Sequence, residues 1–151
     1  MISRKGKYAI RAVLYLAQRY GEGPIPIEEI ASAEKISRKF LETILLELRY
    51  AGVLDSKRGK GGGYLLRETP SRLTVGRIIR VVEGPLSPVD CVSRSAYRPC
   101  ADCLDESSCR IRLVMKEVRD AISRVLDRKT LAALVEEGRV PHSAEWYMIG
   151  I

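Results

Sequence analysis

The cysteines are the residues of this chain whose type and spacing most directly indicate chemistry. All four lie within 19 residues, in the pattern C-x8-C-x2-C-x5-C: Cys91, Cys100, Cys103 and Cys109. The two-residue gap lets Cys100 and Cys103 bind one metal, and the other gaps bring further sulfur atoms round in a short loop. Soft thiolates suit both an iron-sulfur cluster and tetrahedral zinc, so ligand type alone does not choose between them.

Metal-free interpretations of the same cysteines stay open. The basic neighbours Arg98, Arg110 and Arg112, together with the helix start expected after Cys109, would lower thiol pKa values. Low thiol pKa values favour metal binding and also favour a reversible thiol switch. Inert cysteines are the remaining interpretation.

The composition indicates a soluble protein with one domain and an appendage. The chain has 151 residues, of which 46% are hydrophobic and 30% charged. It can therefore bury a core, yet no apolar run reaches the roughly 18 residues that a membrane span needs. The basic N-terminus lacks the uninterrupted apolar stretch and cleavage site of a signal peptide, which predicts a cytoplasmic protein. In that compartment, clustered cysteines are more typical of metal or redox sites than of structural disulfides.

The positive charge is confined to the front half of the chain. The net charge is +7; residues 1–84 hold 16 Lys or Arg against 9 Asp or Glu, whereas residues 85–151 hold 10 of each. A basic face confined to one module is typical of a surface that binds a polyanion, because each phosphate that is neutralised releases a counterion. A merely solvated basic domain is the alternative.

The order of elements in the front half predicts a winged helix-turn-helix. Apolar residues recur at helical spacing over residues 8–20, a short second helix ends near Lys35, and a third helix is capped by Ser37 and closed by Gly52. Two short strands follow, joined by a basic glycine-rich loop over residues 58–63. We therefore expect a mainly α fold with a small β wing, whose third helix is sized for the major groove of DNA.

The predicted DNA contacts come from the chain start, the third helix and the wing. The candidates are Arg4, Lys5, Ser37, Arg38, Lys39, Phe40, Glu42, Thr43, Arg58, Lys60 and Gly61. Helix N-terminal amides suit a phosphate, and glycines at the wing tip let the backbone approach a sugar-phosphate chain. Glu42 has two interpretations: it accepts from a cytosine amino group, or it pairs on the helix surface with Lys39 or Arg38.

An enzyme is not predicted. The triple glycine leads into a strand, whereas a phosphate-binding loop runs into a helix. A small redox enzyme or electron carrier built on the cysteine loop has no accompanying general base or nucleophile, and the lone His142 lies in a tail with Trp146.

The back half is predicted to sense and to dimerise. A helix capped by Thr74 ends at Gly84–Pro85, a long loop covers residues 85–109, and the longest helical pattern of the chain runs from Arg110 to Leu126. Its apolar stripe comprises Leu113, Val114, Val118, Ala121, Ile122 and Val125. We expect the same helix of a second subunit to cover this stripe, which presents two recognition helices to a palindromic operator. Packing back onto its own domain is the alternative.

These observations divide the chain into four parts. Residues 1–84 form the winged helix-turn-helix DNA-binding domain, and residues 85–109 the cysteine-rich sensor loop. Residues 110–137 form the dimerisation helix with a short C-terminal helix, and residues 138–151 a tail.

Several segments resemble the BadM/Rrf-two family of bacterial transcription regulators, which includes repressors of iron-sulfur assembly, nitric-oxide response and cysteine metabolism. The segments are SRKGKYA at residues 3–9, FLE at 40–42, LRYAGVLDSKRGKGGGY at 48–64 and VEGP at 82–85. The likeness covers about residues 1–135. It implies a homodimer crossed through the long helix, with a two-iron or four-iron cluster held by three cysteines and a variable fourth ligand.

On this resemblance Cys91, Cys103 and Cys109 are the cluster ligands, and Cys100 is a fourth ligand or a substitute. The chain departs from the family at two known fourth-ligand positions, which hold Arg112 and Lys7 here. The resemblance thus implies a repressor that senses an iron-sulfur cluster or redox state, with zinc less expected. The cluster-free alternative keeps the DNA-binding dimer and senses through a thiol switch or a partner enzyme, as in the cysteine-metabolism branch.

Overall fold

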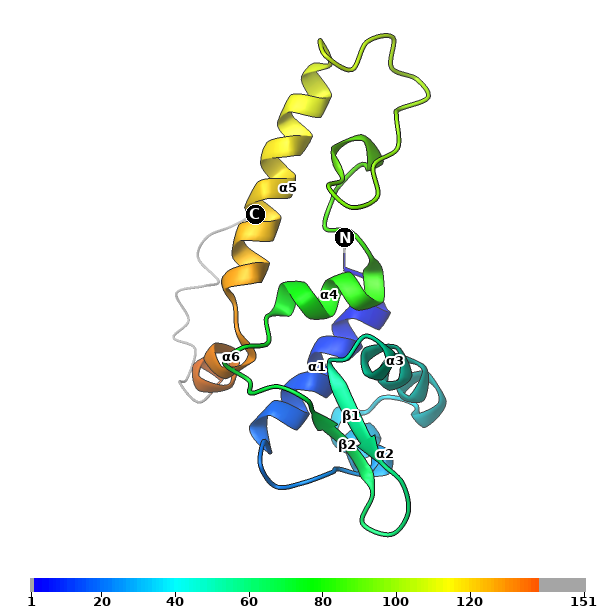
Figure 1. The fold of residues 1–151 in the computed structure, drawn as a ribbon, viewed down its shortest axis with the longest axis vertical. Helices are drawn as coiled ribbons and strands as arrows, with labels where there is room; N and C mark the ends of the chain where they lie inside the picture. The colour runs from blue at the N-terminus through cyan, green and yellow to red at the C-terminus, as the bar shows by residue number, and fades with distance from the viewer. Residues whose placement is uncertain (1, 139–151) are drawn as a thin grey trace.

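The computed structural model describes residues 2–138, which form a helical body with a projecting arm (Figure 1). In chain order the elements are α1 (Arg4–Gln18), α2 (Ile27–Glu34), α3 (Arg38–Tyr50), β1 (Leu54–Lys57), β2 (Gly63–Leu66), α4 (Val75–Glu83), the 3-10 helix η1 (Asp90–Val92), α5 (Arg110–Arg128) and α6 (Leu131–Glu137). The two strands form an antiparallel sheet. This arrangement confirms the predicted mainly α fold with a small β wing. The predicted tail beyond residue 138, with His142 and Trp146, lies outside the described residues.

Helix α1 begins four residues earlier than predicted. The apolar periodicity starts at Tyr8, but the helix starts at Arg4 because the Ser3 side chain accepts a hydrogen bond from the amide of Gly6. A serine in this position satisfies an amide that the first helical turn leaves unpaired. The prediction was wrong at this end, and Arg4 and Lys5 consequently lie on the first turn of a helix.

The turn between α2 and α3 follows the predicted cap. Lys35 adopts a left-handed conformation with φ of 52° and ends α2. Ser37 then caps α3, because its side chain accepts from the amide of Phe40. The short turn fixes α3 against α2, as a helix-turn-helix requires.

The core lies between α1 and α3. The inward stripe of α3 is fully buried and comprises Leu41, Ile44, Leu45 and Leu48. It belongs to one cluster with the small and branched residues of α1, which are Ala9, Ala12, Val13 and Leu16. Burying a leucine or isoleucine side chain contributes roughly 1.5–3 kcal/mol, so this stripe anchors α3 and leaves its opposite face to solvent.

The wing is fastened to the body by a third extended segment. Strand β1 pairs with β2 from Leu54↔Leu66 to Lys57↔Gly63. Ile25 and Tyr64 exchange two backbone hydrogen bonds, of 2.9 Å and 2.8 Å. A side chain at Gly63 would place its Cβ 2.2 Å from the Ile25 carbonyl oxygen, so glycine permits this close approach. The base of the wing is therefore held, while its tip projects.

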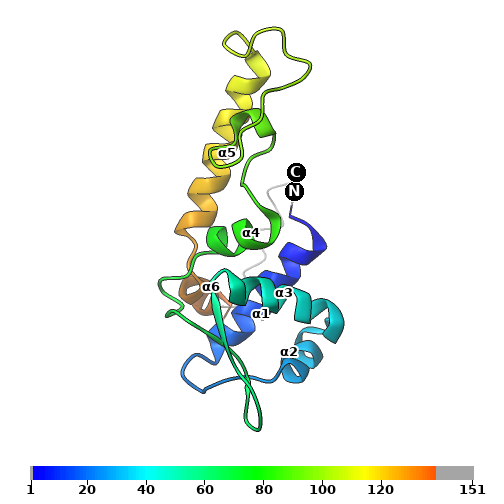
Figure 2. The ribbon, with the colours of Figure 1, turned by 45° about the vertical axis from the view of Figure 1, so that its right-hand side comes forward.

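Helix α4 connects the body to the arm. It packs against α1, α3 and α5. The two guanidinium Nη atoms of Arg80 bind the carboxylate of Asp127 at 2.5 Å and 2.8 Å, which ties α4 to the end of α5. Helix α5 and the loop before it project from the body on the side opposite the wing tip in both views (Figure 2).

Helix α6 returns to the winged-helix body. Leu131 is fully buried in the same core as α3, and its amide donates a 2.9 Å hydrogen bond to the carbonyl of Leu73. The short C-terminal helix thus packs with the first part of the chain, although it follows the arm in sequence. Among residues 2–138, none of the helices has the length and apolar content needed to cross a membrane.

Candidate DNA-binding face and cysteine loop

The solvent face of α3 carries the predicted polar contacts. Ser37, Arg38, Lys39, Glu42 and Thr43 are all exposed. Arg38 forms an ion pair of 3.1 Å with Glu28 of α2, and both side chains are more than 60% exposed. Glu42 forms no ion pair within the described residues, so the expected pairing with Lys39 or Arg38 is not found there. Thr43 bonds back to its own helix, donating from its hydroxyl to the Lys39 carbonyl at 3.3 Å.

Two other predicted contact residues are engaged inside the protein. The Lys5 ammonium lies 2.7 Å from both carboxylate oxygens of Glu47, which joins the first turn of α1 to α3. The Phe40 ring packs edge-on against Tyr8, with centroids 5.9 Å apart. Both residues therefore fix α3 against α1, whereas Arg4 remains exposed.

The wing tip is an exposed basic turn. The amide of Gly62 donates to the carbonyl of Gly59 at 3.0 Å, which closes the turn. Arg58, Lys60 and Gly61 are exposed at this tip. No acidic side chain of the described residues neutralises either cation.

The unpaired cations of the front half gather on the elements predicted to meet DNA. Most of its other basic side chains form ion pairs, for example Arg67 with Asp55 at 2.6 Å and Arg77 with Glu68 at 2.5 Å. Within residues 2–138, the structure shows neither an ion pair nor a side-chain hydrogen bond for Arg4, Lys7, Lys39, Lys57, Arg58 and Lys60. They lie at the start of α1, on α3 and in the wing. Lys35, between α2 and α3, and Arg72, before α4, also show neither contact in this part of the chain.

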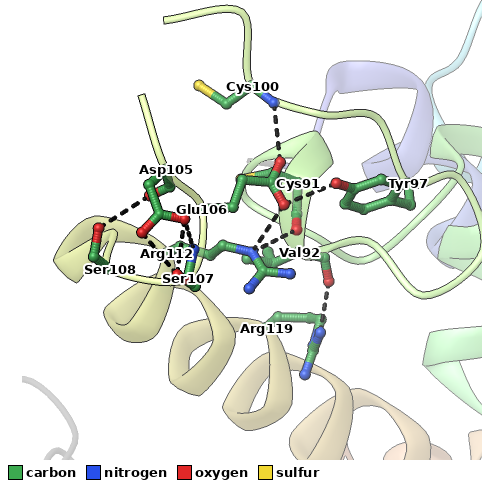
Figure 3. Close-up of polar contacts among 10 residues, drawn as sticks. All are labelled: Cys91, Val92, Tyr97, Cys100, Asp105, Glu106, Ser107, Ser108, Arg112 and Arg119. Carbon is green, nitrogen blue, oxygen red and sulfur yellow. Dashed lines mark hydrogen bonds and ion pairs between the residues drawn. The ribbon is translucent and has the colours of Figure 1, made fainter. Parts of the chain in front are cut away.

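Arginines of α5 hold the cysteine loop by its backbone (Figure 3). Arg112 donates from Nε to the carbonyl of Cys91 at 3.3 Å. Two turns further, Arg119 donates from Nη1 to the carbonyl of Val92 at 2.6 Å. These contacts dock η1 against the first half of α5.

Glu106 is the second fastening of the loop. Its carboxylate accepts from the Tyr97 hydroxyl at 2.8 Å and from the Cys100 amide at 3.3 Å, and it lies 3.7 Å from Arg112 Nε. The hydrogen bond raises the pKa of the Tyr97 hydroxyl. One acidic side chain thus joins two parts of the loop to α5.

Cys103 and Cys109 lie together at the start of α5. The two thiols are close enough to shift each other's pKa values. The amide of Arg112 holds the pKa of Cys109 below its ordinary value, and the Cys103 thiol acts in the same direction. Burial, followed by the contact with Cys109, raises the pKa of Cys103. Cys109 is therefore the stronger nucleophile and ligand of the pair.

The turn between these two cysteines is built on Asp105. Its carboxylate accepts from the hydroxyl and amide of Ser107, at 2.7 Å and 3.0 Å. Those bonds, with Ser108 contributing, lower the pKa of Asp105 to about 2. The carboxylate is thus ionised at neutral pH and shapes the chain between Cys103 and Cys109.

The chain matches a known protein family over nearly all of its described residues. The family model Rrf2, described as an iron-dependent transcriptional regulator, matches residues 2–137. The chain belongs to the Rrf2 family. The resemblance found in the sequence is thereby confirmed.

Individual members agree with this Rrf2 assignment. An rrf2-like HTH-type transcriptional regulator of Rhodobacter capsulatus is 44% identical, with 91% of this chain and 94% of that protein aligned. The structure of CymR, the global cysteine regulator of Bacillus subtilis, matches with a TM-score of 0.75 at 38% identity and covers 91% of this chain and 97% of CymR. IscR of T. potens matches with a TM-score of 0.73 at 33% identity, covering 97% and 96%.

The Rrf2 assignment establishes the broad function. This chain is a DNA-binding transcription regulator and not an enzyme, as the sequence predicted, because the family and the relatives named above are regulators. These relatives carry different regulator names, CymR, IscR and rrf2-like. The comparison therefore does not assign a signal to the cysteine loop of this chain.

The thiols of this Rrf2 chain fit an iron-sulfur cluster by donor type, since four soft sulfur ligands lie in one loop. The structure brings Cys103 and Cys109 together. It does not gather Cys91 with them, and within residues 2–138 no three His, Cys, Asp or Glu side chains converge into a metal-binding group. Cys91 is held instead on η1, where Arg112 bonds to its carbonyl, and Cys100 is exposed.

Sequence reasoning missed the acidic side chains that position the candidate residues of this Rrf2 chain. Glu47, Glu83 and Glu106 each fasten a predicted functional segment to another element. Only Glu83 had a sequence signal, as part of the Glu-Gly-Pro corner. Glu47 and Glu106 bind residues of other elements, and no local sequence pattern predicts how those elements pack together.

Proposed function

We propose that this protein is a homodimeric repressor that binds a palindromic operator through α3 and the wing and senses an iron-sulfur cluster in residues 85–109. The DNA-binding unit is residues 1–84, supplemented by α6, and α5 supplies the dimer contact. Cys91, Cys103 and Cys109 would hold the cluster, with Cys100 as fourth ligand or substitute.

The observation that carries this proposal is the separation of paired from unpaired cations. Six cations at the start of α1, on α3 and in the wing have no internal partner among residues 2–138, whereas Lys5, Arg67 and Arg77, which join elements of the body, are ion-paired. A cation paired inside the protein has to break that pair before it binds a phosphate, and an unpaired one does not. The unpaired set includes Arg4, Lys39, Arg58 and Lys60, all proposed to contact the DNA backbone.

The dimer is supported by the uncovered face of α5. No residue of this helix is buried, and its apolar stripe leaves Leu113 57%, Val114 54% and Val125 62% exposed. The stripe continues into an apolar groove of about 700 Å³ between α5 and residues 85–88, which Val118 and Ile122 also line. A second copy of α5 has the complementary apolar face, and a two-fold pair would place two α3 helices on one operator.

The chain's own residues supply a route from sensor to dimer contact. Arg112 and Arg119 dock the loop on the helix that carries the stripe. A bound cluster would supply a redox-active group whose oxidation or loss alters the loop. Because the loop is fastened to α5 at two points, a change in its conformation moves the dimer helix.

A second candidate keeps the DNA-binding dimer and removes the cluster. The proximity of the Cys103 and Cys109 thiols at the start of α5 favours a reversible thiol switch in the same loop. The similarity to CymR, named a cysteine regulator, supports this version too, as it supports sensing through a partner enzyme.

Anaerobic purification separates these candidates. The cluster proposal expects coloured protein with iron and sulfide in equal amounts, and colourless Cys91→Ala, Cys103→Ala and Cys109→Ala variants. Colourless protein with stoichiometric zinc would contradict it. Normal operator affinity in iron-free protein, lost on mild oxidation, would support the thiol switch instead.

The DNA contact is tested at the wing. Replacing Arg58 and Lys60 together by Gln removes two proposed phosphate contacts, so the slope of log affinity against log salt should become shallower by about 2. The matched control replaces Arg124 and Arg128 of α5 by Gln, with the same charge change and an unaltered slope. A folded double wing variant with undiminished operator affinity would remove the wing from the interface.

A further inference from the structure

The end of α4 reaches across the body to the start of α1. A single carboxylate oxygen of Glu83 accepts from the Ser3 amide at 2.9 Å, the Ser3 hydroxyl at 2.5 Å and the Gly6 amide at 3.0 Å. These donors belong to the first turn of α1, where helical amides lack partners within the helix. Glu83 therefore caps α1 from a separate element that is 77 residues away from Gly6 in sequence.

The residue at position 6 makes room for this carboxylate. A Cβ on Gly6 would lie 2.2 Å from the Glu83 oxygen, well inside van der Waals contact. A glycine within a helix costs about 0.5–1 kcal/mol relative to alanine, so the first turn depends on its caps. The Ser3 hydroxyl accepts from the Gly6 amide at 3.2 Å, and a second cap comes from outside the turn. Glu83 supplies that cap.

The capped turn carries part of the proposed DNA face. Arg4 and Lys7 lie on it without internal partners, and Lys5 joins it to α3 through Glu47. The turn is thus held from two sides, by α3 through Glu47 and by α4 through Glu83. Its position determines where the two free cations stand relative to the recognition helix.

The residue after Glu83 starts the path to the cysteine loop. Gly84 has φ of 90° and ψ of −153°, a conformation open essentially to glycine alone, and directs the chain into Pro85. Pro85 and Glu83 line the same groove as Ile2, together with Val118 of α5. The start of α1, the end of α4 and the dimer helix therefore meet at one place.

We propose that Glu83 is a positioning residue for DNA binding: its carboxylate sets the first turn of α1 so that Arg4 and Lys7 reach operator phosphates, and it joins that turn to the segment leading to the cysteines. The proposal rests on the DNA-binding face described above. It adds a connection between sensor and DNA that bypasses the dimer helix.

The test combines operator affinity with its salt dependence. Glu83→Ala should weaken operator binding about tenfold and make the salt slope shallower by about 2, because two phosphate contacts are lost. Glu83→Gln keeps an oxygen acceptor at the cap, so it should restore most of the slope. A loss of stability alone does not change the number of phosphates contacted by the folded protein.

A double-mutant comparison sharpens the assignment. Replacing Arg4 and Lys7 by Gln in the Glu83→Ala background should cost almost nothing further, because the three residues act as one unit. Glu68→Ala serves as the control: it breaks the ion pair to Arg77 of α4 without touching α1, so affinity and slope should remain unchanged.

The outcomes separate this proposal from the function on which it rests. Unchanged slope in a folded Glu83→Ala dimer, or full additivity with the Arg4 and Lys7 replacements, overturns the role of Glu83 while leaving DNA binding intact. Absence of operator affinity in the unaltered protein overturns both.

Discussion

Arg119 lies in the middle of α5, and its guanidinium donates a 2.6 Å hydrogen bond to the carbonyl oxygen of Val92, the residue after Cys91. Only 14% of the Arg119 side chain is exposed, so water competes weakly for this bond. The same arginine also pairs with Asp120 at 2.8 Å. The short helix η1, which contains Cys91, is thus fastened directly to α5.

Replacing Arg119 by Gln should release η1 from α5. A hydrogen bond from a charged donor contributes about 1.5 kcal/mol or more, so opening of the loop should become about tenfold more frequent. Trypsin cleavage after Arg94 measures that opening, because the bond after Arg98 leads into Pro99 and resists trypsin. Arg128→Gln is the control, since it removes an arginine from the end of α5 that forms no hydrogen bond or ion pair with the loop among residues 2–138. Unchanged cleavage would show that other contacts hold the loop.

Replacing Leu131 by Ala should destabilise the winged-helix body, although this residue follows the arm in sequence. Leu131 is fully buried, and truncation of such a side chain costs about 2–5 kcal/mol. Urea unfolding followed by circular dichroism gives the free energy. Leu104→Ala changes a fully exposed leucine and should alter stability by less than about 0.5 kcal/mol. Equal effects of both variants would contradict the placement of α6 in the core.

Sequence patterns predict local features such as helix caps, but they do not predict contacts between distant elements such as the burial of Leu131. Ser37 and Thr74 were identified as caps because a cap is a local feature, and both accept the predicted amide bonds. The packing of Leu131 in the winged-helix core was not predicted. A short apolar repeat indicates that one face of a helix is buried, but it does not indicate which element covers that face. Contacts between distant elements, such as that of Glu83 with Gly6, depend on packing that no local period encodes.

The spacing of the cysteines likewise did not predict which of them come together in space. The pattern C-x8-C-x2-C-x5-C predicted a metal-binding loop, and the structure places Cys103 beside Cys109. The position of Cys91 depends on Arg112 and Arg119, whose guanidinium groups bond to the carbonyls of Cys91 and Val92 in addition to their acidic partners Glu106 and Asp120. Spacing limits how far apart two sulfur atoms can be, but the side chains around them decide whether they meet.

Replacing Glu28 by Gln should strengthen DNA binding. Glu28 pairs with Arg38 at 3.1 Å on an exposed surface, and the pair has to be broken before Arg38 can bind a phosphate. Exposed pairs contribute about 0.2–1 kcal/mol, so operator affinity should rise by up to about fivefold. Glu137→Gln removes the same charge from the pair with Lys129 of the C-terminal helix region and should have a smaller effect. A decrease in affinity would place Arg38 away from the DNA.

The contribution of Glu83 to stability should depend on pH. The Ser3 hydroxyl, together with two backbone amides, holds the pKa of Glu83 below its ordinary value of 4.5. A carboxyl with a depressed pKa stabilises the folded state above the unfolded pKa and loses this effect as pH falls through the lower folded value. The stability difference between the unaltered protein and Glu83→Gln should therefore be constant near neutral pH and shrink below about pH 4.5. Urea unfolding from pH 3 to 7 measures it, and a difference that grows on acidification would reverse the assigned sign.

Replacing both Val118 and Ile122 by Lys should convert the dimer to a monomer. Each side chain is 37% exposed and lines the groove against which a second α5 is proposed to pack. Two buried ammonium groups per subunit would have to lose their hydration, with like charges facing one another across the two-fold axis. Sedimentation at micromolar concentration should show one subunit, and affinity for a palindromic operator should fall to that for a half-site. Because both residues lie outside the winged-helix core, circular dichroism should show the same helix content in the body, whereas a variant that remains dimeric would place the subunit contact elsewhere.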